Sequence, residues 1–304
     1  MDGKLFSQDF LQHGIKDTPV YKAINDEIFF QFKESLIHIF DSITASTVMN
    51  EANTESDIID KVLALLNWQD LSLKQVTATQ KRRDDVPDYL LFLSSEKKSK
   101  AQAESKEDRR YLHGISIVEA KKWLRPLDRG DETNTLDPST PSNQILRYLS
   151  SVEIASNRAI SFGVLTNGAL WRLYWQGARS RSEEFLEIDL AAALQVKGIA
   201  QNLFGFDADH ILKVFYCVFN LQAFLPQTWD NSARTFHAFA LNEARLYEER
   251  VSEDLGKKVF DIVFPQIANA LAANDEKANL DDTNYLDELR EATLVLLYRL
   301  LFIF

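Results

Sequence analysis

An acidic and a basic residue stand two positions apart at the end of a short apolar run. Residues 115–118 are typical of a buried strand, and Glu119 and Lys121 follow them with Ala120 in between. Side chains alternate between the two faces of a strand, so Glu119 and Lys121 are expected to point the same way. Two opposite charges in this arrangement form either a surface ion pair or a metal ligand beside a charged helper.

A second carboxylate precedes the neighbouring apolar segment. Asp88 follows a proline and opens the apolar run at 89–93. If this run and the strand over 114–121 pair as hairpin neighbours, Asp88 and Glu119 share one face and one end of the sheet. Two converging carboxylates suit Mg²⁺, which polarises a phosphodiester and lowers the pKa of an attacking water. Lys121 on the same face would orient that water or stabilise the developing charge.

The elements that must position these side chains follow from hydrophobic periodicity. Apolar residues at helical spacing predict helices over 20–45, 50–68 and 143–157. Extended segments are expected over 71–93 and 159–168, and the stretch "ALWRLYWQG" is predicted to return as a hairpin partner after an Asn-Gly turn.

Polar segments and caps set the limits of these elements. Residues 94–110 and 125–142 are almost wholly polar and are interpreted as loops or poorly ordered excursions. Thr54 and Asp57 resemble a capping box near the start of the second helix. From about residue 207 onward the chain is mostly helical. We therefore expect an α/β domain with a mixed central sheet flanked by helices, followed by an all-helical region.

Composition limits the possible classes of protein. A single cysteine excludes an internal disulfide, and the absence of a membrane-length apolar run or a signal segment favours a cytoplasmic location. The net charge is −11, but residues 71–190 hold 19 basic against 17 acidic residues, whereas the remainder holds 15 against 28. A polyanionic partner at the middle segment is therefore permitted. The histidines lack zinc-ligand spacing. The sequence also lacks a Gly-x-x-x-x-Gly-Lys phosphate-binding loop, so an ATP-driven motor is not expected in it.

The chemistry-bearing residues fit a known pattern. Asp88 after its proline, followed about thirty residues later by Glu119-Ala120-Lys121, resembles the PD-(D/E)XK nuclease superfamily. Residues 51–68 resemble the first helix of the nuclease domains at the N-termini of type I restriction subunits and type IIG restriction-modification enzymes. In those families the opening glutamate approaches the metal site. The corresponding residue here is Glu51, with Glu55 one turn on as its substitute.

Two further segments extend the resemblance. Gln144 and Tyr148 have the Q-x-x-x-Y spacing found in related nucleases on the helix after the core strands, and one helical turn places both on the same face. The stretch "GVLTNGALWRLYW" resembles the hairpin that follows that helix. The similarity covers about residues 45–195. It departs from the family in its long polar segments and in "LNW", where Leu-Gly-Trp is usual.

The resemblance implies a fold, a reaction and partners. The fold would be a restriction-endonuclease-like mixed sheet, with a helical segment at 1–45, a nuclease domain at 46–200 and a helical connector at 201–304. The activity would be site-specific hydrolysis of double-stranded DNA with Mg²⁺, for which Mn²⁺ can substitute. The C-terminal "LLYRLLFIF" resembles the connector to the methyltransferase of type IIG enzymes, so methyltransferase and target-recognition domains downstream are expected, together with a possible transient dimer.

The resemblance also assigns roles to individual residues. Asp88, Glu119 and Glu51 would hold the metal, Lys121 would position or activate the water, and Gln144 with Tyr148 would frame the site or the DNA backbone. Basic residues near the same strands are candidates for phosphate contacts. These residues are Lys122, Arg125, Arg82 and Arg83.

Each residue also has a structural alternative. Asp88 could begin a turn after proline, Glu119 and Lys121 could form a partly exposed ion pair, and Glu51 could be a first-turn helix charge. Gln144 and Tyr148 could be solvent-edge helix residues, and the basic residues could be solvated loop charges. At the level of function, the rivals are a noncatalytic nuclease-like DNA-binding or assembly module, and a nuclease acting on RNA or on single-stranded or branched DNA.

Overall fold

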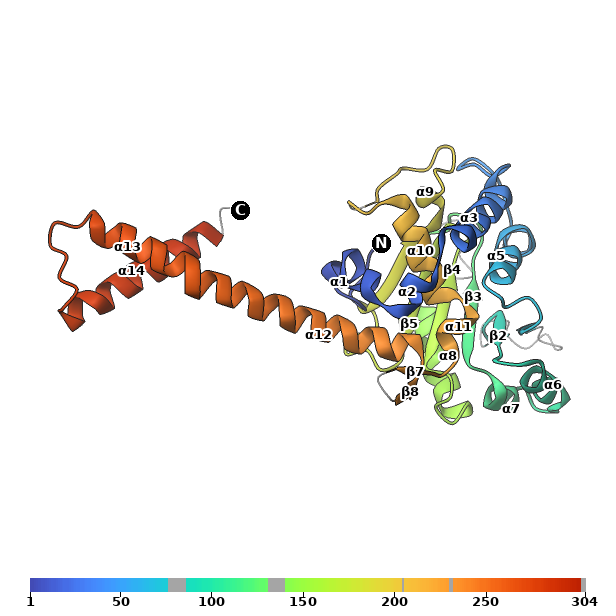
Figure 1. Ribbon diagram of the computed structural model, residues 1–304. Helices are drawn as coiled ribbons and strands as arrows, with labels where there is room; N and C mark the ends of the chain where they lie inside the picture. Colours follow the sequence, from blue (N-terminus) through green and yellow to red (C-terminus); the bar gives the residue numbers. More distant parts are fainter. Residues whose placement is uncertain (76–85, 131–139, 204, 230–231, 302–304) are drawn as a thin grey trace. The chain divides into compact units, whose positions relative to one another are not determined.

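The computed structural model describes two compact units, Met1–Ala244 and Arg245–Phe304 (Figure 1). The described residues are 1–75, 86–130, 140–203, 205–229 and 232–301.

A six-stranded sheet forms the centre of the first unit. Its strands lie in chain order, β1 to β6, and every neighbouring pair is antiparallel except β3 and β4, which are parallel. Helix α8 makes the crossover that a parallel pair requires. The strands are β1 Ser72–Lys74, β2 Tyr89–Leu91, β3 Ser116–Ala120, β4 Phe162–Thr166, β5 Leu170–Trp175 and β6 Phe185–Asp189.

Helices surround this sheet, and a small hairpin of β7 Gln227–Trp229 and β8 Ser232–Arg234 follows them. The chain also makes a π-helical turn, η2 Glu55–Ile59, and the 3₁₀ turns η1 Gly14–Asp17 and η4 Tyr111–His113. The helices are α1 Gln8–Gln12, α2 Pro19–Ala23, α3 Asp26–Phe40, α4 Glu51–Thr54, α5 Asp60–Leu65, α6 Ser95–Ala103, α7 Glu107–Arg110, α8 Pro141–Ala155, α9 Leu190–Ala193, α10 Ala208–Phe219, α11 Leu221–Phe224 and the beginning of α12 Phe236–Lys257.

Apolar side chains cover both faces of the sheet. On one face, α8 buries Leu149 in a cluster with Leu90 of β2 and Leu165 of β4. On the other face, the ring of Trp171 on β5 lies 5.4 Å from that of Phe215 on α10. Removing these surfaces from water is the main force that fixes the helices to the sheet. The expected α/β architecture, with a mixed sheet flanked by helices, is confirmed at this level.

The second unit is helical. It contains the end of α12, the π-helical turn η5 Lys258–Val263, α13 Phe264–Ala273 and α14 Thr283–Leu301, and α13 packs on α14. The predicted helical region at the end of the chain is therefore present. Among the described residues, no helix combines the length and apolar character needed to cross a membrane.

Two local predictions are wrong. The predicted helix over 20–45 is two helices, because the Asn25 side chain accepts the Ile28 N–H and starts α3 anew. Residues 94–110 contain α6 and α7 rather than a loop. Ser94 caps α6 by accepting the Lys97 N–H, and Ala101 is fully buried. This segment is polar but rich in good helix formers, so an N-terminal cap and one packed side chain are enough to stabilise a helix.

The compact units do not follow the predicted boundaries at 45/46 and 200/201. Helix α3, before the first boundary, packs its Phe32 on Phe215 of α10, which lies beyond the second. Because Phe215 also packs on the sheet through Trp171, both helical segments share one core with it. The division falls instead within α12, after Ala244.

Candidate active site

Strand pairing brings the two predicted carboxylates together. Tyr89 of β2 lies opposite Val118 of β3, and continuing this antiparallel register by one residue places Asp88 opposite Glu119. Asp88 Oδ2 accepts the backbone N–H of Ala120 at 2.7 Å, which fixes the carboxylate against the end of β3. The prediction that these strands are neighbours is therefore confirmed.

The helical segment α4–η2 brings two more carboxylates to the same place. Asn50 caps α4 by accepting the Asn53 N–H, so the predicted capping box at Thr54 is wrong. Thr54 is instead buried inside the helix. Its hydroxyl donates to Asn50 O at 2.9 Å and accepts the Trp123 N–H at 2.8 Å. This one side chain therefore joins the helix to the segment that follows β3.

Three carboxylates form a cluster that could hold a cation. One oxygen each from Glu51, Glu55 and Asp88 lies within 4.8 Å of the other two, and all three side chains are partly buried. Carboxylate oxygens are the ligands that Mg²⁺ and Mn²⁺ prefer. Glu55, which was expected only as a substitute for Glu51, belongs to the cluster together with it. Glu119, which was expected as a metal ligand, is not one of the three.

Glu119 and Lys121 form a buried ion pair beside this cluster. They are 2% and 4% exposed, and Lys121 Nζ donates to Glu119 Oε1 at 2.5 Å. Lys121 Nζ also lies 4.0 Å from Glu51 Oε1, so the pair adjoins the carboxylate cluster. The alternative of an exposed surface pair is excluded by this burial. The other oxygen, Glu119 Oε2, is buried and has no hydrogen-bond partner among the described residues.

An unpartnered buried carboxylate oxygen has a physical cost, which a cation or a water would remove. Together with the oxygen chemistry of Glu51, Glu55 and Asp88, it shows that the residues present fit a hard divalent ion.

The carboxylate of Asp88 has a perturbed pKa. Burial raises its pKa from 3.8 to about 6, and the negative charges of Glu51 and Glu55 act in the same direction. The Lys121 ammonium and the Ala120 N–H oppose this increase. A cation placed among these groups would favour the ionised form and release the bound proton.

The buried pair has perturbed pKa values as well. Burial is the largest cause that raises the pKa of Glu119, to about 8, and the nearby Asp88 charge adds to it, whereas Lys121 lowers it. For Lys121, burial lowers the pKa, but Glu119 and Glu51 outweigh it and the pKa is raised. The site therefore retains protons at neutral pH more strongly than the same side chains do in water. Such perturbation is typical of functional sites.

Helix α8 places the predicted Gln-Tyr pair beside the sheet. Gln144 Nε2 donates to the Tyr148 hydroxyl at 2.8 Å, as the one-turn spacing predicts. Tyr148 is buried, which excludes the solvent-edge alternative for it. Its pKa is raised by burial and then by the charge of Glu119, so its hydroxyl lies within electrostatic reach of the buried pair.

The predicted phosphate contacts have separate outcomes. Arg82 and Arg83 lie outside the described residues. Lys122 is partly buried and Arg125 is buried, and both already interact with other groups of the chain. The Arg125 carbonyl also accepts the Asn167 amide at 2.9 Å. These two residues are therefore part of a packed segment at the end of β3, and their role as DNA contacts stays a prediction.

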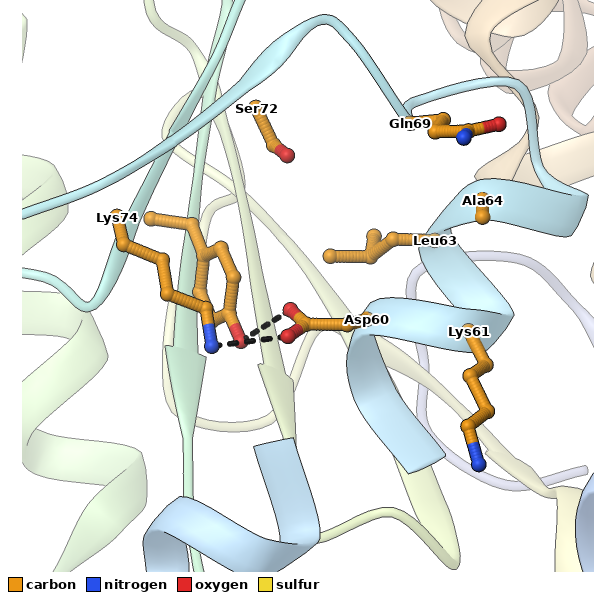
Figure 2. Close-up of a pocket in the computed structure, with 8 residues that line it drawn as sticks. Asp60, Lys61, Leu63, Ala64, Gln69, Ser72 and Lys74 are labelled. Carbon is orange, nitrogen blue, oxygen red and sulfur yellow. Dashed lines mark hydrogen bonds and ion pairs between the residues drawn. The ribbon is translucent and has the colours of Figure 1, made fainter. Parts of the chain in front are cut away.

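A polar network behind Glu55 was not anticipated from the sequence. Its members are Asp60, Lys74 and Tyr89, and Figure 2 shows the Asp60 and Lys74 side chains pointing toward each other in the lining of a pocket. The only signal in the sequence is the position of Lys74 on the extended segment that pairs with Tyr89. No pattern in the sequence predicts the π-helical turn that brings Asp60 to this place.

Comparison with known proteins adds no relative. Protein-family models, curated proteins and solved structures give no match to this chain. Its function is therefore inferred from the geometry of its own residues.

Proposed function

We propose that this chain is a metal-dependent DNA endonuclease module of the PD-(D/E)XK type, belonging to a restriction-modification protein. One observation carries the proposal: Glu51, Glu55 and Asp88 converge on a point beside the buried pair of Glu119 and Lys121. The cluster supplies hard oxygen ligands, and the Lys121 ammonium supplies a fixed donor group where a phosphate or its attacking water would lie.

The fold supports the proposal in two respects. A helix is followed by three antiparallel strands, a crossover helix and a strand parallel to the third, so the sheet is mixed as the resemblance implies. Asn67 adopts a positive φ of 68°, a conformation that glycine favours and asparagine tolerates. This accounts for asparagine at the position where the related families have the glycine of Leu-Gly-Trp.

The residues have distinct roles in the proposed reaction. Mg²⁺, held by Glu51, Glu55, Asp88 and Glu119, would polarise the scissile phosphodiester and acidify a water. Lys121, held in place by Glu119, orients the attacking water and stabilises the negative charge that develops on the phosphate.

Helix α8 and the turn after β3 complete the proposed site. Tyr148, oriented by Gln144, would frame the site or the DNA backbone next to Glu119. Lys122 and Arg125 would follow the DNA backbone. Mn²⁺ would substitute for Mg²⁺, because both ions take oxygen ligands.

The substrate and partners extend the same proposal. Double-stranded DNA is the substrate, and a methyltransferase and target-recognition domains of the same cytoplasmic protein supply sequence specificity, as in type IIG enzymes. Two copies of the module would associate transiently to cut both strands. Type I systems offer the alternative assembly, with a motor downstream.

DNA cleavage tests the proposal. The chain is incubated with plasmid DNA, single-stranded DNA and RNA in Mg²⁺ or Mn²⁺, beside Asp88→Ala and the matched control Asp57→Ala, which removes an exposed carboxylate from η2. We expect the wild type and Asp57→Ala to cut duplex DNA, and Asp88→Ala to be inactive. Cleavage that survives Asp88→Ala or excess chelator would contradict the proposal, and inactivity of metal-loaded wild type would favour the noncatalytic module.

A further inference from the structure

Two donor groups, Lys74 and Tyr89, contact the carboxylate of Glu55. Lys74 Nζ lies 3.0 Å from Glu55 Oε2, and the Tyr89 hydroxyl lies 3.3 Å from the same oxygen, its single proton being shared with the closer Asp60 carboxylate. Asp60 engages both donors, at 2.9 Å from Lys74 Nζ and 2.8 Å from the Tyr89 hydroxyl. Both contacts with Glu55 are made to Oε2 rather than to Oε1.

Local structure builds this arrangement from two elements. In the pairing of β1 with β2, Lys74 lies directly opposite Tyr89, so both side chains share a face. In η2, the Asp60 N–H bonds to Glu55 O, five residues back. In a regular α-helix, residues five apart point about 140° away from each other. The wider π-helical turn brings Asp60 round to the side of Glu55, and such turns are frequent at functional sites.

The network faces solvent through a pocket of about 400 Å³, lined in part by Asp60, Lys74 and Tyr89 (Figure 2). The Lys74 and Asp60 side chains are 45% and 39% exposed, whereas that of Glu55 is 18% exposed. Ion pairs exposed to this extent contribute little to the stability of a fold. The main consequence of the network is therefore the orientation of Glu55 rather than the stability of the domain.

The charges of the pocket also exclude an alternative role. Lys74 contacts two carboxylates, Glu55 and Asp60, so the three groups together carry a net negative charge and do not suit an anion. The second lysine of the pocket, Lys61, points away from this group in Figure 2. Binding of a DNA phosphate in the pocket is thus disfavoured by the charge balance.

We propose that Lys74 is a positioning residue of the metal centre. It holds Glu55 through Oε2, the Tyr89 hydroxyl lies beside the same oxygen, and Asp60 contacts both Lys74 and Tyr89. This inference rests on the proposed function, because it needs a cation at Glu51, Glu55 and Asp88. Partners that orient a ligating carboxylate typically change metal affinity by about 10–100-fold when they are removed.

Mn²⁺ binding tests the proposal. Free Mn²⁺ is measured by electron paramagnetic resonance during titration of the wild type, Lys74→Met, Lys74→Arg and Lys61→Met, and the melting temperature of each metal-free protein is recorded. We expect Lys74→Met to weaken Mn²⁺ binding by about tenfold at an unchanged melting temperature. Lys74→Arg should restore most of the affinity because it keeps the charge, and Lys61→Met should bind as the wild type does.

A second variant removes only one donor. Tyr89→Phe keeps the buried ring, and we expect it to weaken Mn²⁺ binding less than Lys74→Met does. Unchanged or tighter binding by Lys74→Met, beside normal binding by the wild type, would overturn the positioning role and leave the proposed function standing. The positioning role would also be overturned if Lys74→Met and Lys74→Arg lost the same Mn²⁺ affinity and both melted at a lower temperature than the wild type. Absence of Mn²⁺ binding in the wild type would overturn both proposals.

Discussion

Lys121 Nζ lies 2.5 Å from Glu119 Oε1, and the two side chains are only 5% and 3% exposed. A buried pair of this kind is costly to build, since both charges leave water and only good geometry compensates. The pair lies at the end of β3, where Lys121 Nζ is 4.0 Å from Glu51 Oε1. This position fits the catalytic use of the Lys121 charge that we propose.

Glu119→Gln should abolish cleavage without unfolding the domain. Glutamine keeps an oxygen that accepts the Lys121 hydrogen bond, but it removes the charge that would complete a cation site. We expect the single-turnover rate of DNA cleavage to fall by at least ~100-fold, with an unchanged circular dichroism spectrum. Glu96→Gln, at an exposed ion pair on α6, is the matched control. Cleavage at the wild-type rate by Glu119→Gln would exclude a catalytic role for this carboxylate.

The raised pKa of Glu119 should make metal-free stability depend on pH. Its pKa is about 8 in the folded chain against 4.5 as a reference, so the folded state retains a proton that the unfolded chain releases. This contribution to the free energy of unfolding is fully present below pH 4.5 and is lost as the pH rises through 8.

Urea unfolding between about pH 5 and 8 measures this loss. We expect the free energy of unfolding of the wild type to fall relative to that of Glu119→Gln across this range. Saturating Mn²⁺ should reduce the fall, because the ion favours the ionised carboxylate. Parallel pH profiles for the two proteins would show that Glu119 has the same pKa in the folded and unfolded states.

Thr54 should be needed to attach the α4–η2 segment to the sheet. Thr54→Val removes the hydroxyl that accepts the Trp123 N–H, and leaves that donor buried without a partner. We expect a loss of about 1–3 kcal/mol in the free energy of unfolding, measured in urea. Mn²⁺ binding should weaken as well, since Glu51 and Glu55 lie on this segment. Thr54→Ser keeps the hydroxyl, and a loss as large as that of valine would show that the methyl group matters instead.

His237 should make the first unit sensitive to acid. It is fully buried between the rings of Phe162 and Phe224, and Nε2 donates to Val218 O at 2.8 Å. Burial lowers its pKa from 6.5 to about 4, so only the unfolded chain gains a proton as the pH falls between these values. Stability should therefore decrease by about 3 kcal/mol from pH 6.5 to pH 4.

Urea unfolding of wild type and His237→Gln over this range isolates the effect of the histidine. Glutamine can still donate to Val218 O but does not titrate. The variant should lose less stability on acidification than the wild type does. An equal acid dependence in both proteins would assign the effect to other groups.

Much of the candidate site could be predicted because it depends on short-range periodicity. Alternation along β3 places Glu119 and Lys121 together, and the helical repeat places Gln144 next to Tyr148. The pairing of β2 with β3, and hence the approach of Asp88, required only that two apolar segments be neighbours. In each case one local geometric rule was sufficient.

The rest depended on tertiary contacts or on irregular backbone. The joint participation of Glu51 and Glu55 follows from how α4 and η2 dock through Thr54, which periodicity does not specify. The π-helical turn that carries Asp60 toward Lys74 replaces a regular helix at the same residues. The division of the chain within α12 reflects packing between segments far apart in sequence, as at Phe32 and Phe215.

Calorimetric titration with Mn²⁺ and Mg²⁺ tests the central claim most directly, because it needs no knowledge of the DNA recognition sequence. The wild type, Asp88→Ala and Lys121→Ala are compared. The proposed site predicts saturable binding by the wild type, loss of binding in Asp88→Ala, and retained binding in Lys121→Ala. Absence of binding by the wild type at millimolar metal, or binding that is unaffected by Asp88→Ala, would contradict the assignment of a metal-dependent nuclease site to these residues.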